Sequence, residues 1–155
     1  MRRTDREITD LETMLKTVGA CDVLRLGLAD TACPYVVPVN FGYEYKDGQL
    51  TLYFHGAAAG RKFTLLKKGG PVAFEMDTDH QLVTGPVACA YSFRYHSVLG
   101  EAVPEILTER EEALHALEKI MEHYTGRADF PMKEQMLARV CVVRLKVTAW
   151  SCKGH

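Results

Sequence analysis

The sequence predicts a mainly β fold, a small antiparallel barrel with flanking α-helices. Six segments have the alternation of apolar and polar residues that is typical of strands, and turn signals separate them at short spacing. Two segments with helical periodicity lie at the start of the chain and in its last third. A length of 155 residues with 47% hydrophobic residues fits one domain, 1–155, with a core that needs no disulfides.

The first half of the chain begins with a helix expected over residues 9–18. Thr9 and Glu12 have the spacing of a capping box, and Gly19 is a natural helix stop. The hydrophobic period then changes from 3.6 to 2. The strands that we expect along the whole chain are residues 23–28, 35–42, 50–55, 72–76, 91–103 and 140–150.

Helices and loops are expected between these strands. A short helix is expected at 61–68, and the polar stretch 77–86 is expected to be a loop. A long helix is expected at 108–126, because Thr108 stands three residues before a glutamate and an apolar stripe follows. One or two helical turns are expected at 132–138.

Composition and charge exclude several classes of protein. The net charge is −1 and the pI is about 6.6, so we expect no basic surface for nucleic acid. The apolar stretches are far shorter than the ~20 residues of a membrane span, and no signal-peptide core follows the basic N-terminus. The five cysteines are odd in number and lack CxxC spacing, so we expect a reduced cytoplasmic protein without a structural metal site.

A candidate phosphate site follows the strand that ends at His55. The small residues of 56–60 form a tight loop, and Arg61 and Lys62 then begin a helix. Arginine offers a bidentate fork and lysine a point charge, which together suit a phosphate monoester. The alternative is that both cations are simply solvated. The spacings GxxxxGK[ST] and GxGxxG are absent, so neither a nucleoside triphosphate site nor a Rossmann dinucleotide site is predicted.

A second candidate site is the segment 34–42. Pro38 has no backbone N–H, Asn40 offers a side-chain amide, and Gly42 permits close approach of another group. A flat aromatic ligand can lie along such a strand and use its free backbone groups. The alternative is a bulged barrel edge without a ligand.

Five blocks of sequence occur in a recognisable order. They are MRRTDREI (1–8), PYVVPVNFG (34–42), LYFHG (52–56), GRK (60–62) and YHSVLG (95–100). With them the chain resembles the pyridoxamine 5′-phosphate oxidase-like FMN-binding split-barrel superfamily, in its nitroimidazole-resistance (Nim-type) branch. The resemblance spans nearly the whole chain.

The resemblance implies a six-stranded antiparallel split β-barrel that forms a homodimer, with FMN at the subunit interface. The isoalloxazine ring would lie beside 37–40, and Arg61 and Lys62 would hold the phosphate. The cofactor-binding residues implied are Val37, Pro38, Val39, Asn40, Phe54, His55, Arg61, Lys62, Ser97 and Val98. The C-terminal residues 150–155 lack the pyridoxal-phosphate-binding residues of the true oxidases, so we do not expect vitamin B6 oxidation.

His55 is the candidate catalytic residue. If Leu50, Leu52 and Phe54 fill the barrel, His55 points away from the core, toward the place where the family holds flavin and substrate. An ordinary histidine pKa near 6.5 suits proton transfer at cellular pH. The alternative is a histidine that only caps the strand end.

The sequence therefore favours an FMN-dependent oxidoreductase, similar to flavin reductases or nitroreductases, acting on a small electron-poor substrate. NAD(P)H is the expected electron donor. Two alternatives stay open: a flavin-binding or storage protein without activity, and a haem-binding barrel in which His55 or His155 ligates iron. The adjacent cations at 61–62 favour a phosphate-bearing cofactor over haem.

Overall fold

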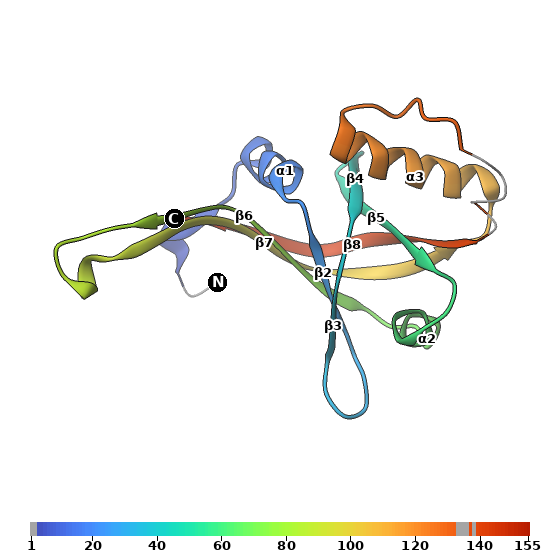
Figure 1. The fold of residues 1–155 in the computed structure, drawn as a ribbon, viewed down its shortest axis with the longest axis horizontal. Coiled ribbons are helices and arrows are strands. Elements are labelled where there is room, and N and C mark those ends of the chain that lie inside the picture. The colour runs from blue at the N-terminus through green and yellow to red at the C-terminus, as the bar shows by residue number, and fades with distance from the viewer. Residues whose placement is uncertain (1–2, 133–136, 138) are drawn as a thin grey trace.

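The computed structural model describes residues 3–132, 137 and 139–155. The strands form one open antiparallel sheet in the order β3-β2-β6-β7-β8-β5-β4, and β1 pairs with β8 (Figure 1). The strands are β1 (Glu7–Ile8), β2 (Leu24–Leu28), β3 (Tyr35–Val39), β4 (Phe41–Lys46), β5 (Gln49–Ala57), β6 (Val72–Val83), β7 (Ser92–Leu107) and β8 (Val140–Gly154). The helices are α1 (Leu11–Ala20), α2 (Arg61–Lys67) and α3 (Arg110–Thr125), with 3₁₀ turns at Thr4–Arg6 and Ala88–Ala90.

The mainly β antiparallel architecture is confirmed, but the described residues form eight strands instead of six. One additional strand is β1. The other arises because the expected strand 35–42 is broken at Asn40 into two strands, β3 and β4. The alternation of buried and exposed side chains holds up to Asn40 and then fails, because Phe41 and Gly42 are both buried. β3 pairs with β2 and β4 pairs with β5, at opposite ends of the sheet order.

β5 has apolar neighbours on both of its faces. Leu52 and Phe54 are fully buried in the barrel core, as the sequence predicted. Tyr53 points to the opposite face and packs with Ala116 and Ile120 of α3. The sheet therefore carries two apolar clusters, the larger inside the barrel and the smaller under α3. β5 separates them, and its C-terminal end brings His55 to the α3 side.

The helix starts differ from the sequence prediction. Asp10, and not Thr9, caps α1: its carboxylate accepts a hydrogen bond of 2.9 Å from the backbone N–H of Thr13. The capping box predicted at Thr108 is not formed, because α3 has Glu109 at its N-cap and no side-chain cap. No helix within the described ranges is long and apolar enough to cross a membrane. The prediction for 132–138 falls largely outside the described residues.

Most of the stretch 77–86 is not the loop that its polarity predicted, and only residues 84–86 are loop. β6 continues to Val83 and pairs with β7, with a register shift between Thr78 and Gln81 and a positive φ of 58° at Asp79. The resulting hairpin arm extends away from α2 and α3 (Figure 1). Its residues are polar because most of them are exposed, so the polarity reports exposure and not the absence of a strand.

The contact between α3 and β4 leaves no room for a side chain at Gly42. A Cβ atom there would lie 2.4 Å from the backbone nitrogen of Ile120. Gly42→Ala should therefore lower the free energy of unfolding by about 1–3 kcal/mol, since overpacking forces the helix outward. Gly27→Ala is the matched control, because its Cβ would meet Ala73 at an ordinary 3.5 Å. Urea unfolding should show a change within about 1 kcal/mol for the control. Equal stability of the two variants would contradict the packing described.

Candidate functional site

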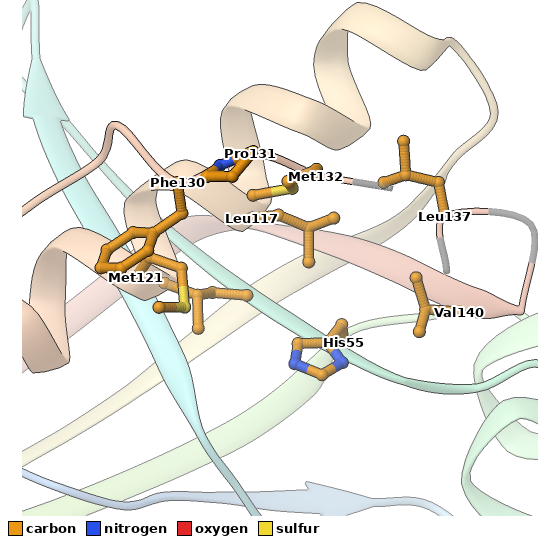
Figure 2. A pocket seen from close by; sticks show the side chains of 9 residues that line it. His55, Leu117, Met121, Phe130, Pro131, Met132, Leu137 and Val140 are labelled. Carbon is orange, nitrogen blue, oxygen red and sulfur yellow. The ribbon is translucent and has the colours of Figure 1, made fainter. Parts of the chain in front are cut away.

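His55 lies at the mouth of an apolar cavity between β5 and α3. The cavity has a volume of about 360 Å³, and Figure 2 shows side chains of α3 and of residues 130–132 across from the imidazole ring. The described residues that line it are His55, Leu117, Ile120, Met121, Phe130, Pro131, Met132, Leu137 and Val140. His55 is therefore the one polar side chain among the described lining residues.

The surroundings of His55 favour its neutral form. Part of its surface is open to the cavity, but the packed apolar groups around the ring lower its pKa through desolvation, and the charge of Lys62 lowers the pKa further. The imidazole has no hydrogen-bond partner within the described part of the chain. Both ring nitrogens of His55 are consequently available to a bound molecule.

Lys62 is a half-buried cation in the first turn of α2. Its ammonium group lies 5.4 Å from the ring centre of Phe54 and 5.5 Å from that of Phe63. Gly56 leaves room for it, since a Cβ there would lie 3.0 Å from Nζ. Burial lowers the pKa of Lys62, and no carboxylate of the described residues pairs with it. Lys62 is a partly desolvated charge without a carboxylate partner among the described residues, which suits an anionic ligand.

Arg61 is adjacent in sequence but points elsewhere. Its Nη2 lies 2.8 Å and its Nε 3.0 Å from Asp30 Oδ2, and its guanidinium lies 4.5 Å from the ring centre of Tyr35. These contacts tie the start of α2 to the loop between β2 and β3. Nη1 has no hydrogen-bond partner among the residues described, so one corner of the fork is available. The two cations thus differ, with Lys62 unpaired and Arg61 already engaged.

The segment 37–40 forms an edge of the sheet. β2 is the strand that pairs with β3, and among the described residues no strand pairs with the other side of β3. The side chain of Val39 is buried and that of Val37 is half-buried, whereas Pro38 and Asn40 are exposed. Backbone groups of this edge and the amide of Asn40 can therefore meet a ligand, and the side chain of Val39 cannot.

Ser97 and Val98 lie on opposite faces of β7. Val98 is fully buried in the barrel core, so it can offer only its backbone to a ligand. Ser97 is 6% exposed, and its hydroxyl is a buried polar atom without a hydrogen-bond partner in the described residues. It borders a shallow cavity on the outer face of the sheet, together with Tyr95 and Lys153. A buried hydroxyl without a partner fits a site where another molecule completes the hydrogen bond.

These residues form two groups in one chain. His55 pairs with Val142 of β8, whereas Ser97 pairs with Lys153, eleven residues later on the same strand. At ~3.3 Å per residue, this separation is about 36 Å along the strand. The structure therefore brings together Phe54, His55 and Lys62, and it holds Ser97 far from them.

Comparisons with known proteins decide the family. A family model described as pyridoxamine 5′-phosphate oxidase matches residues 10–153. The chain belongs to the pyridoxamine 5′-phosphate oxidase family. No curated protein matches it.

Solved structures of similar proteins support this assignment. A candidate 5-nitroimidazole antibiotic resistance protein from Bacteroides thetaiotaomicron is 32% identical over 96% of this chain and 86% of its own, with a TM-score of 0.82. It confirms the resemblance to the nitroimidazole-resistance branch. An FAD and haem binding protein from Mycobacterium smegmatis shares the fold at 19% identity, over 96% of this chain and 73% of its own, with a TM-score of 0.81.

Sequence reasoning missed the wall of the cavity in this member of the oxidase family. Leu117 and Met121 belong to the apolar stripe of α3, and such a stripe looks the same whether it meets a core or a pocket. Phe130 lies between the helix expected at 108–126 and the helical turns expected at 132–138, where the sequence analysis proposed no site residue. The sequence signal for the cavity was His55, because a polar residue at the end of an apolar strand indicates a candidate site there.

The lowered pKa of His55 gives the protein a defined pH dependence. The unfolded chain binds a proton at this residue near pH 6.5, and the folded chain binds it only at lower pH. Acid therefore favours unfolding, and the stability of the wild type falls as the pH drops through 6.5. His55→Gln lacks this effect, so its stability relative to wild type should rise between pH 8 and pH 5 in chemical unfolding. A difference that does not change with pH would contradict the environment described for His55.

Proposed function

We propose that the protein is an FMN-dependent oxidoreductase, similar to flavin reductases or nitroreductases, that acts on a small electron-poor substrate at a homodimer interface. NAD(P)H is the proposed electron donor. The observation that carries the proposal is Lys62, a half-buried cation at the end of β5 that has no carboxylate partner among the described residues. The chain also belongs to a family of oxidases. The same fold occurs in a protein from Mycobacterium smegmatis that binds FAD and haem.

The residues present fit an FMN molecule. Lys62 and the available corner of Arg61 suit its phosphate, which needs positive charge and hydrogen-bond donors. The free edge of β3 and the amide of Asn40 suit the polar edge of its ring, which has alternating donors and acceptors. Bound FMN supplies the redox chemistry, and the protein supplies binding, orientation and electrostatics.

His55 is the proposed catalytic residue. Its neutral imidazole carries one N–H, and both ring nitrogens lack partners in the described residues. From this position the neutral ring can donate a hydrogen bond to a substrate that gains electrons, and the ring can donate a proton only after it has itself been protonated. Oxidation of NAD(P)H with a nitroaromatic acceptor tests activity directly. Turnover supports the enzyme, and binding of FMN without turnover with any acceptor supports a flavin-binding or storage protein.

The homodimer is supported by the separation of Ser97 from His55 and Lys62. One flavin cannot reach both groups in one chain, because they lie about 36 Å apart along β8. If Ser97 contacts the flavin, as the family resemblance implies, it does so from a second copy. The outer face of β7 also exposes Phe93 and Leu99 on either side of Ser97, and exposed apolar groups of this kind are typical of an interface.

The phosphate assignment predicts a preference for FMN over riboflavin. Lys62→Ala should weaken FMN binding by about 1.5–3 kcal/mol, roughly 10- to 150-fold, and leave riboflavin binding almost unchanged. Lys68→Ala, which removes a charge just after α2, is the control and should bind FMN like the wild type. Flavin fluorescence titration measures the FMN affinities of the three proteins and the riboflavin affinities of the wild type and Lys62→Ala. Equal binding of FMN and riboflavin by the wild type would refute the assignment.

The dimer predicts a mass near twice 17.4 kDa in light scattering at micromolar concentration. Leu99→Glu should shift the protein toward the monomer and weaken FMN binding, because it places a charge in the proposed interface. Leu11→Glu on α1 is the matched control, since Leu11 is 42% exposed and Leu99 is 46% exposed. A wild-type monomer that keeps its FMN would contradict the proposed interface.

A further inference from the structure

The cavity beside His55 is lined by apolar side chains and one imidazole in its described part. Its described lining comes from β5, α3, residues 130–132, Leu137 and the start of β8, and apart from His55 it consists of apolar side chains. Leu117 and Met121 of α3 and Phe130 lie across from the imidazole (Figure 2). A volume of about 360 Å³ is within the range of small-molecule pockets.

This lining disfavours charged ligands. No lysine, arginine, aspartate or glutamate belongs to the described wall, and a charge moved there would lose its hydration without gaining a partner. The imidazole of His55, held neutral by its surroundings, offers one donor and one acceptor. A single polar substituent on the ligand can therefore be satisfied, and the rest of the ligand has to be apolar.

The apolar lining also makes the cavity a poor site for the flavin ring itself. The polar edge of an isoalloxazine ring carries several donors and acceptors, and His55 alone cannot satisfy them. The free edge of β3 and Asn40 offer more such groups. Lys62 contacts Phe54, whose side chain lies on the barrel face of β5, whereas His55 faces α3. The cations and the cavity thus meet at the same strand end from its two faces, where a molecule in the cavity can approach a flavin held by the cations.

We infer that this cavity is the acceptor pocket, and that it selects a neutral, flat aromatic molecule with one polar substituent directed at His55. Phe130 provides a flat apolar wall, and Met121 and Met132 provide flexible side chains that adapt to the shape of the ring. The assignment of the molecule as an electron acceptor rests on the proposed function. The selection of a neutral aromatic ligand rests on the lining alone.

Nitrobenzene and 4-nitrobenzoate test this selection, because they share a nitroaromatic ring and differ by a negative charge. Titration of the protein as purified, followed by NMR, should shift the signals of the His55 ring and the Met121 methyl group in a saturable way with nitrobenzene. The affinity for 4-nitrobenzoate should be at least tenfold lower. Equal affinity for both compounds, or unshifted His55 and Met121 signals at saturation, would overturn the inference.

Variants of Leu117 locate the binding site. Leu117→Gln keeps the side-chain size but adds a polar group to the wall, and it should weaken nitrobenzene binding about tenfold. Leu117→Met should bind like the wild type, which shows that the position tolerates substitution. Leu11→Gln, on the exposed start of α1, is the control for a surface leucine. Unchanged binding in Leu117→Gln would overturn the inference.

The FMN affinity of the same variants separates this inference from the proposed function. Leu117→Gln should retain the FMN affinity of the wild type, because Leu117 belongs to the cavity wall and neither to the cations nor to the edge of β3. If neither the wild type nor any variant binds FMN but nitrobenzene still binds, the proposed cofactor is refuted and the assignment of the pocket stands. If FMN binds normally but nitrobenzene is not preferred over 4-nitrobenzoate, the assignment of the pocket is refuted and the proposed cofactor stands.

Discussion

The architecture depends on one connection, the passage from β3 to β4 through Asn40. The two strands are joined by a single residue, yet they pair at opposite ends of the sheet order. The sheet therefore curls around the core without a hydrogen-bonded seam between these strands. An unpaired strand edge is normally a hazard for aggregation, and proteins cover it or use it. Pro38 removes one donor from this edge, and a bound molecule or a second copy of the chain can use the remaining groups.

β5 determines which side chains face the candidate site. Because side chains alternate along a strand, burying Phe54 in the barrel directs Tyr53 and His55 toward α3. The hydrophobic core thus fixes the direction of His55, the one polar residue among the described residues of the cavity wall. α3 in turn packs so closely on Gly42 that the helix cannot approach or retreat without disturbing β4. Packing, and not a polar network, sets the geometry around His55.

Local patterns predicted the fold class, most strands and the face of His55, because each depends on neighbours within a few residues. The break at Asn40 was missed, since residues 35–42 read as one strand and only the closure of the whole sheet requires a turn there. The strand through 77–83 was missed because exposure on an arm gives a strand the composition of a loop. The pairing of Arg61 with Asp30 joins residues 31 positions apart, and the sequence contains no signal for it. The family resemblance, not periodicity, identified Ser97.

Lys62, which has no carboxylate partner among the described residues, is the proposed binding residue for the flavin phosphate. Haem in the same fold is the strongest competitor, and His155, one of its two candidate ligands, is already hydrogen-bonded to Ser92 at 2.8 Å. The visible absorption spectrum of the purified protein, after addition of FMN and removal of the excess, distinguishes the cofactors. We expect flavin absorption bands that correspond to about one FMN per chain. A Soret band, or a colourless protein that does not retain FMN, would contradict it.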